Sequence, residues 1–270
     1  MMTRADTYTH GHHDSVLRSH RSRTAENSAG YLLPHLRPGQ ALLDIGCGPG
    51  TITLDLATRV DPGQTVGLDR AELPLVQARA MAREQDRHNV GFTVGDAYQL
   101  DFPDNSFDVV HAHQVLQHLT DPVAALTEMR RVCRPGGVVA ARDADYAAMT
   151  WYPADPRMDR WLELYHQVAR GNGAEPDAGR RLLTWARAAG YADVACSASA
   201  WCYSNDDERA WWGGLWAERI TESAMAHQAV SGRFSHPDEL AELAAGWRDW
   251  AGQEDGWFVV LNAEILCHVS

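Results

Sequence analysis

A glycine-rich loop around residue 46 is the part of the sequence whose residue types could do chemistry. The segment 44–51 reads DIGCGPGT, follows a short apolar run and opens a helical pattern. Glycine tolerates backbone angles that other residues avoid and lets the chain approach a bound molecule closely. The N-terminus of the following helix offers free N–H groups to an anion. The loop therefore predicts a site for a small ligand with a negatively charged group; glycines that merely turn the chain are the alternative.

The spacing of this loop separates two kinds of ligand. The dinucleotide fingerprint G-x-G-x-x-G requires a glycine where the sequence has Thr51. The pattern present is acidic-x-G-x-G-x-G, and its acid, Asp44, can face an ammonium group. S-adenosylmethionine carries both a carboxylate and an ammonium group, whereas NAD carries no ammonium group. The spacing therefore favours S-adenosylmethionine over NAD as the cofactor.

Two further aspartates end the next apolar runs of the chain. Asp69 can accept hydrogen bonds from both hydroxyls of a ribose, and Asp96 can accept one from the amino group of an adenine, with the backbone N–H of Ala97 on the ring. The alternatives are that Asp69 is an ordinary polar residue at a strand end and that Asp96 caps the following helix. A glycine loop followed by two acids in this order predicts an adenosyl-cofactor site.

A parallel sheet is needed to bring these residues together. Apolar runs alternate with helical patterns in units of about 30 residues, which favours a parallel sheet with helices on both faces. Strands are expected at 41–45, 64–70, 90–95, 107–113 and 138–146, and helices at 50–60, 74–85 and 121–133. Two later strands, 193–203 and 256–269, complete the prediction of an α/β fold with a doubly wound, mostly parallel seven-stranded sheet.

The rest of the chain is expected to cover this core. Residues 1–35 are interpreted as a flexible polar arm and a helix, from Asp14 or Ser15 to about Leu33, that act as a lid. Residues 36–146 are the cofactor-binding core, and residues 147–270 combine the remaining core strands with helical insertions that form a substrate cap. All 10 tryptophans follow residue 150. On one helical stretch, a pocket for an aromatic or prenylated molecule can be lined by Trp211, Trp212 and Trp216. The alternatives are that these tryptophans pack the cap onto the sheet or form a homodimer surface.

Two stretches of the sequence resemble the class I, Rossmann-like S-adenosylmethionine-dependent methyltransferases, and within them the ubiquinone/menaquinone-biosynthesis methyltransferase family. LLDIGCGPGTITLDLA is similar to the first motif of that family, and the stretch from VGDAYQL to RRVCRPGG is similar to its later motifs. The resemblance covers about residues 40–142. It implies a cofactor pocket formed by Asp44, Gly46, Gly48, Asp69, Asp96, Ala97 and His113. The predicted cofactor contacts also include Tyr8 of the arm, Cys47 and Gly50 of the loop, and Arg70.

The segment after the fourth strand departs from the quinone-methylating enzymes. From His113 to Leu119 it reads HQVLQHL, where those enzymes carry an F-G-L-R-N-like segment, and this difference disfavours a quinone substrate. The N-P-P-Y-type segment of the enzymes that methylate amino groups of nucleic acids and glutamine is absent there as well. The resemblance therefore implies the cofactor and a small-molecule substrate without identifying that substrate.

Methyl transfer from a sulfonium is an in-line displacement, so alignment and exclusion of water can supply much of the rate. A base is needed only where the acceptor atom arrives protonated. Histidine suits that role, and we expect His113 or a histidine of residues 10–13 to act as the base. Asp145 and Tyr146, after the fifth strand, are expected to contact the substrate. For each histidine the alternative is an ordinary hydrogen-bonded polar residue.

The composition narrows the class of function. Asp and Glu total 36 against 24 Lys and Arg, a net charge of −12, which disfavours a nucleic-acid substrate despite the local cluster of Arg18, Arg21 and Arg23. No apolar run approaches the ~20 residues of a membrane span and no signal-peptide core is visible, so a cytoplasmic protein without a membrane partner is expected. The 5 cysteines form no C-x-x-C pair, and no metal site is predicted. A catalytically silent S-adenosylmethionine-binding protein and an NAD-linked oxidoreductase are the alternative functions.

Overall fold

Eight strands of the described residues form a single sheet in the computed structural model, which describes residues 6–11 and 13–270. The strands are β1 (Leu42–Ile45), β2 (Thr65–Asp69), β3 (Val90–Val94), β4 (Phe107–His113), β5 (Cys133–Ala144), β6 (Thr150–Tyr152), β7 (Asp193–Tyr203) and β8 (Trp257–His268). Their order is β3-β2-β1-β4-β5-β8-β6, with β7 also paired to β8. β1 to β5 pair in parallel, and β8 runs antiparallel to β5, β6 and β7. The predicted α/β fold with a mostly parallel sheet is confirmed; the short β6 is an additional strand that the pattern did not predict.

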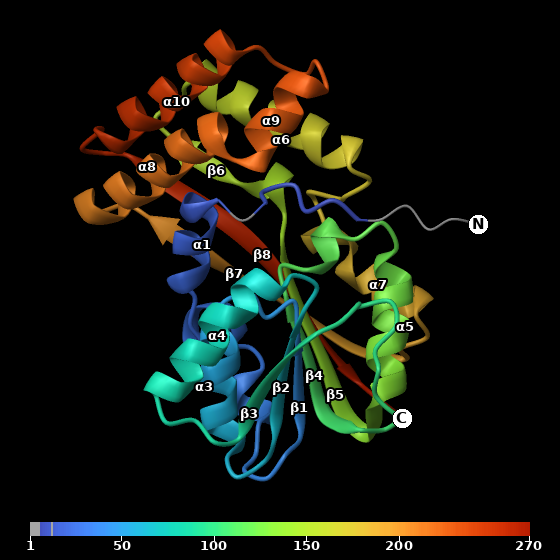
Figure 1. The fold of residues 1–270 in the computed structure, drawn as a ribbon. Helices are drawn as coiled ribbons and strands as arrows, with labels where there is room; N and C mark the ends of the chain where they lie inside the picture. Colours follow the sequence, from blue (N-terminus) through green and yellow to red (C-terminus); the bar gives the residue numbers. More distant parts are fainter. Residues whose placement is uncertain (1–5, 12) are drawn as a thin grey trace.

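The central parallel strands are buried on both faces. Every residue of β1 and β4 is buried, as expected for strands that helices cover on both sides. One face is covered by α3 (Thr51–Val60) and α4 (Glu72–Glu84), and the other by α5 (Pro122–Val132) and α7 (Leu182–Ala188) (Figure 1). Asp121 caps α5 by accepting a hydrogen bond from the backbone N–H of Ala124. The carboxyl ends of the strands thus lie in a fixed frame.

The N-terminal helix is shorter than predicted. α1 (Asp14–Arg21) ends early, and a second helix, α2 (Ala25–Ala29), follows in place of one long helix. The reason is local: Thr24 accepts a hydrogen bond from the N–H of Asn27, and the Asn27 side chain accepts one from the N–H of Thr24. This capping box starts a new helix. The break leaves Arg23 in the connection between the two helices.

Residues 6–11 run along the seam between the sheet and an upper layer of helices (Figure 1). Thr9 is 0% exposed and His10 is 5% exposed. This part of the predicted arm is therefore packed into the structure and is not a solvated arm. The prediction for His12 lies outside the described residues.

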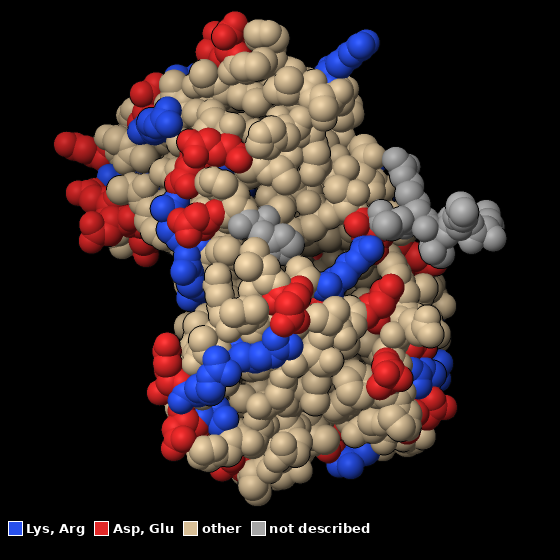
Figure 2. Space-filling view, viewed as in Figure 1, with Lys and Arg blue, Asp and Glu red and all other residues tan. Residues whose placement is uncertain are grey.

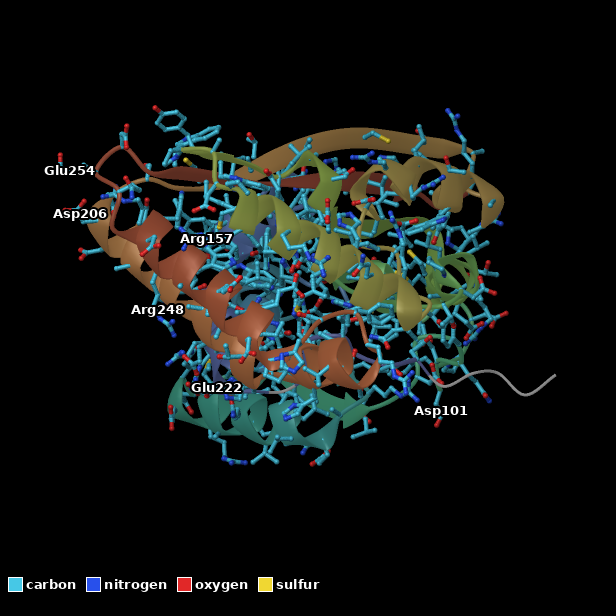
Figure 3. The ribbon with its side chains drawn as sticks, turned by 90° about the horizontal axis from the view of Figure 1, so that it is seen from above. Asp101, Arg157, Asp206, Glu222, Arg248 and Glu254 are labelled. Atoms are coloured by element: carbon cyan, nitrogen blue, oxygen red, sulfur yellow. The ribbon has the colours of Figure 1, made fainter. Side chains whose placement is uncertain are left out.

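The upper layer is a helical cap with an aromatic core. It consists of α6 (Pro156–Gly171), α8 (Asp206–Glu222), α9 (Ala224–Ser231) and α10 (Pro237–Ala251) (Figure 1). Trp161 meets Trp216 and Trp247 edge-on, with ring centroids 4.6 and 4.8 Å apart. Such pairs add about 0.5–1.5 kcal/mol each beyond their buried area. Seen from above, the charged residues Asp206 and Glu254 lie at one edge of the molecule (Figure 3). Among the described helices, none is long and apolar enough to span a membrane.

Two adjacent glycines of α8 differ sharply in the space around them. A Cβ at Gly213 would lie 2.8 Å from both the Ala251 Cβ and the Trp247 carbonyl oxygen of α10, whereas one at Gly214 would have no atom within 4 Å. We expect Gly213→Ala to lower the free energy of unfolding by about 1–3 kcal/mol, because α8 and α10 must move apart. Gly214→Ala should raise it by about 0.5–1 kcal/mol, because alanine is the better helix former. Urea unfolding followed by circular dichroism measures both, and equal effects would contradict this packing.

Candidate active site

A cavity of about 1090 Å³ lies between the carboxyl ends of the parallel strands and the cap. Its volume is at the upper end of the ~300–1,000 Å³ of ordinary ligand pockets, which leaves room for a cofactor and a second small molecule. Among the cofactor contacts predicted from the sequence, those that line this cavity are Tyr8, Asp44, Gly46, Cys47, Gly48, Asp69, Arg70, Asp96, Ala97 and His113. Gly50 is the predicted contact that does not line it.

The glycine loop is shaped by left-handed backbone at its glycines. Gly46 has φ 66° and Gly50 has φ 83°. A Cβ at Gly46 would lie 2.3 Å from Val115 Cγ2, so no side chain fits there. Gly50 precedes the first residue of α3, and a Cβ there would lie 2.8 Å from the Ala78 Cβ. Gly50 therefore turns the chain into the helix while its neighbours form the cavity wall.

Asp44 is held by two hydrogen bonds inside the protein. Its Oδ1 lies 2.7 Å from His111 Nδ1, and its Oδ2 accepts a hydrogen bond of 2.5 Å from the Thr53 hydroxyl. Asp44 is 2% exposed and His111 is 0% exposed. Carboxylate oxygens have further lone pairs, so these bonds still leave room for an ammonium donor. Contact between Asp44 and an ammonium group stays a prediction, while the network fixes the carboxylate at the cavity floor.

Asp69 and Asp96 flank the opposite part of the floor. Asp69 accepts hydrogen bonds from the N–H of Gly48, at 3.0 Å, and of Ala71, at 2.9 Å. It thereby ties the glycine loop to the end of β2. Asp96 accepts one from the N–H of Tyr98 through Oδ1, and its Oδ2 has no hydrogen bond within the described part of the chain. Its local bond and a ligand contact can therefore coexist.

The cap closes the other end of the cavity with aromatic side chains. Those that line it include Tyr146, Trp201, Tyr203, Trp211, Trp212 and Trp216. The Tyr203 and Trp212 rings stack with centroids 4.4 Å apart. Trp212 and Trp216 are also part of the aromatic core of the cap. The same rings therefore pack the cap and line the cavity, while a homodimer surface and the pocket for an aromatic molecule stay predictions.

Three histidines at the seam have pKa values below the usual range: His10 and His113 are buried, and His118 is half-buried. His113 is 6% exposed, and burial next to Arg23 and Arg142 holds its pKa well below the usual 6.5. Burial, with Arg23 nearby, lowers the pKa of His118 to about 3. The pKa of His10 is lowered in the same way. Because an effective general base has a pKa near the working pH, these rings are weak proton acceptors. The assignment of His113 as base stays a prediction.

Of the two residues expected to contact the substrate after β5, only Tyr146 faces the cavity. Its ring stacks on that of Tyr165 with centroids 3.9 Å apart, and its hydroxyl lies 3.4 Å from His10 Nε2. Asp145 lies outside the lining of the cavity and binds the Arg180 guanidinium through both carboxylate oxygens, at 2.6 and 2.7 Å. Its carboxylate thus has a structural partner outside the cavity.

Two arginines of the cavity wall were not among the site residues predicted from the sequence. Arg23 donates a hydrogen bond of 2.7 Å to the Gln114 side-chain oxygen, and burial lowers its pKa to about 10. Arg219 lies on the buried face of α8, one turn beyond Trp216. For Arg219, the sequence offered one indication: it follows Trp216 by three residues on a helical stretch, so both lie on the same face. For Arg23, the indication was the capping box at Thr24, which begins a new helix.

One surface cluster has the residue types of a metal site. Ligand atoms of His13, Glu218 and Glu222 lie within 4.8 Å of one another between α1 and α8. Glu218 also pairs with Arg18, and His13 caps α1. Because protein groups already engage two of its three members, we propose no metal there.

Asp143 positions the loop that follows β4. It is 0% exposed, and its Oδ1 accepts a hydrogen bond of 3.1 Å from the N–H of Gln117, a residue of the cavity wall. Its Oδ2 is enclosed and has no partner among the residues that the structure describes. Burial raises the pKa of this carboxyl from 3.8 to about 7. The loop is thus anchored by a buried acid that titrates near neutral pH.

Comparison with known proteins identifies methyltransferase relatives. A family model described as a methyltransferase domain matches residues 36–191. An uncharacterized methyltransferase of Schizosaccharomyces pombe is 34% identical over 96% of this chain and 95% of its own length. The protein named "Probable methyltransferase ltbC" of Aspergillus luteorubrus is 30% identical over 97% of this chain and 96% of its own length. The two full-length similarities extend over the cap, whereas the match to the family model ends before α8.

Similarity to the quinone enzymes and to solved structures is more limited. A demethylmenaquinone methyltransferase of Listeria welshimeri is 33% identical over 51% of this chain and 55% of its own length. The solved YcgJ protein of Bacillus subtilis has a TM-score of 0.58 at 20% identity, over 96% of this chain and 100% of that chain. The latter similarity shows the fold alone.

The buried Asp143 carboxyl predicts a pH-dependent cost of folding. Because its folded pKa is raised, the unfolded chain ionises first as the pH rises above about 4, and stability falls until about pH 7. Asp143→Asn should therefore become more stable relative to the wild type between these pH values, by up to about 1.4 kcal/mol per pH unit, with no further change above pH 7. Urea unfolding across this range measures the difference, with the exposed Asp101→Asn as control. A pH-independent difference would contradict the assignment.

Proposed function

Because the chain belongs to the S-adenosylmethionine-dependent methyltransferases, we propose that it methylates a small aromatic or hydrophobic molecule. The acceptor is an oxygen, nitrogen or carbon atom of that molecule. The observation that carries this proposal is the continuity of one cavity from the predicted cofactor residues to the aromatic side chains of the cap. A cofactor bound at the sheet end would face a second molecule held at the cap end.

The cavity wall offers a partner for each polar group of the cofactor. Asp69 would accept hydrogen bonds from the ribose hydroxyls. The second oxygen of Asp96 would accept a hydrogen bond from the adenine amino group. Asp44, fixed at the cavity floor, would accept from the ammonium group. The carboxylate would lie between the N-terminus of α3 and the Arg23 guanidinium, both cationic in character. The residues present therefore fit S-adenosylmethionine.

When bound, S-adenosylmethionine would supply an electrophilic methyl group, which passes in line to the acceptor atom as its bond to sulfur breaks and S-adenosylhomocysteine is left. The contribution of the chain is to align the acceptor and to exclude water. Residues 6–11 close the seam, with Tyr8 and His10 in the cavity wall. We propose that Tyr146 and His113 lie beside the reacting molecules, where a neutral His113 can accept a hydrogen bond without adding a charge. The aromatic rings of the cap supply an apolar surface for the acceptor.

The surface charge supports a small molecule as the acceptor. Acidic and basic side chains are interspersed over the face shown in Figure 2, which has no continuous basic stripe. A net charge of −12 also disfavours a polyanion, because phosphate neutralisation supplies most of the affinity for nucleic acid. These observations favour an acceptor small enough to enter the cavity.

Transfer of a labelled methyl group tests the proposed function. With S-[methyl-³H]adenosylmethionine and a panel of small aromatic molecules, we expect label in at least one product. Asp69→Ala should lower the affinity for S-adenosylhomocysteine, measured by calorimetry, by about 100-fold, because two hydrogen bonds to a carboxylate are lost. Asp101→Ala, at the opposite edge of the molecule from Asp206 (Figure 3), should leave it unchanged. Binding without transfer would favour the catalytically silent alternative, and binding of NAD alone would favour the oxidoreductase.

A cofactor fragment isolates the role of Arg23. 5′-Methylthioadenosine keeps the adenosine and the sulfur of S-adenosylhomocysteine but lacks its carboxylate and ammonium group. Arg23→Met should lower the affinity for S-adenosylhomocysteine by about 10- to 100-fold, because a charge-assisted hydrogen bond is lost. The affinity for 5′-methylthioadenosine should change by no more than about twofold. Arg21→Met, which removes an exposed arginine paired with Asp14, is the matched control. Equal weakening of both ligands would show that Arg23 acts on the fold instead.

A further inference from the structure

Arg219 is a buried arginine without a carboxylate partner among the described residues. It is 4% exposed, and its Nη2 donates hydrogen bonds to the Ser15 carbonyl oxygen, at 3.2 Å, and to the Ser19 hydroxyl, at 3.0 Å. The other buried arginines that the structure describes each pair with a carboxylate: Arg142 pairs with the buried Glu264, and Arg209 pairs with the exposed Asp206. Within the described residues, no carboxylate lies within 4 Å of Arg219. An unpaired buried charge is costly, so its retention calls for a reason.

The groups around Arg219 do not neutralise it. The guanidinium lies 4.6 Å from the centroid of the Trp216 ring, a cation–π contact that leaves the charge in place. Burial raises the pKa of Tyr8 to about 12 and raises that of Tyr146, so both hydroxyls stay protonated. Glu208, an acid in the first turn of α8, accepts hydrogen bonds from the backbone N–H groups of Ser204 and Asn205. Burial lowers the pKa of Arg219 itself, but a guanidinium stays protonated in proteins, so Arg219 remains a cation in the cavity wall.

The same face of α8 supplies aromatic surface and donors. Trp212, Trp216 and Arg219 are spaced four and three residues apart, which places them on one side of the helix, and all three line the cavity. Arg219 Nε and the indole N–H groups of Trp212 and Trp216 have no acceptor among the described residues. The Nη1 of Arg219 makes no hydrogen bond with any residue that the structure describes either. This face thus combines apolar rings with unused donors and one cation.

We infer that Arg219 receives the anionic group of the acceptor substrate and that this substrate is an aromatic carboxylate. The inference rests on the proposed function, since it names the class of molecule that occupies the cap end of the same cavity. A planar ring system would lie against the tryptophans while its carboxylate meets the guanidinium, whose planar edge suits that group. One carboxylate matches the single charge of the Arg219 guanidinium, whereas a phosphate dianion would bring a second negative charge to the same group.

The test compares acids with neutral analogues of the same shape. The protein is saturated with S-adenosylhomocysteine and titrated in a calorimeter with benzoate, 2-naphthoate and indole-3-carboxylate, each beside its carboxamide. In the wild type, we expect at least one acid to bind about tenfold or more tightly than its amide. Arg219→Gln should remove this preference, and Arg219→Lys should keep part of it. Arg248→Gln, an exposed change on α10 (Figure 3), should retain the full preference.

The outcomes separate this inference from the proposed function. If S-adenosylhomocysteine binds and no acid binds more tightly than its amide, the substrate class is wrong while the cofactor site stands. If S-adenosylhomocysteine itself does not bind, the proposed function fails first. The wild-type comparison needs no variant, so the inference can be rejected even if Arg219→Gln fails to fold. A preference that persists in a folded Arg219→Gln protein would also overturn the role of Arg219.

Discussion

The buried Asp44 carboxylate is the interaction on which the cofactor half of the cavity depends. Its two oxygens bind His111 of β4 and Thr53 of α3, so one side chain of β1 ties three elements together at the cavity floor. Because Asp44 and His111 are buried, hydrogen bonds to the charged oxygen are strong, and an unpaired charged oxygen would be costly. The glycine loop runs between the strand and the helix that these bonds join. Its position therefore follows from Asp44 as much as from the glycines, and the bonds of Asp69 to the same loop fix its other side.

The seam between sheet and cap is built as a cavity wall and not as a packed core. Polar atoms that have no partner in the described part of the chain gather there, among them His10 Nδ1, both ring nitrogens of His113 and the indole N–H groups of Trp212 and Trp216. Native proteins leave few such atoms unpaired, because each costs stability. Their concentration at one seam is consistent with partners that bound molecules provide. The broken N-terminal helix serves the same seam, because the break admits Arg23 to the wall.

The sequence predicted the sheet and the cofactor end of the cavity because both rest on local patterns. Apolar runs that end in an acid locate strand ends, and parallel strands bring those ends together, so Asp44, Asp69 and Asp96 meet without any knowledge of packing. The cap end depends on contacts between segments far apart in the chain. Whether Asp145 faced the cavity or Arg180 was decided by such a contact, and nothing near position 145 reveals it. The depth of Arg219 likewise follows from how α8 packs on α1.

Charges of both signs line the two ends of the cavity. The sheet end carries Asp44, Asp69 and Asp96 together with Arg23, and the cap end carries Arg219 as well as Asp207 and Glu208 at the start of α8. Among the buried arginines that the structure describes, Arg219 alone has no carboxylate partner. Charges interact more strongly in an enclosed site than in water, so the carboxylates favour the cationic groups of a methyl donor at the sheet end, and Arg219 favours an anionic acceptor at the cap end. With the methyl donor at the sheet end and the acceptor at the cap end, the reacting atoms would meet beside His113 and Tyr146, which are uncharged. The same field that selects the two molecules also orients them, which is most of what an in-line displacement requires of its enzyme.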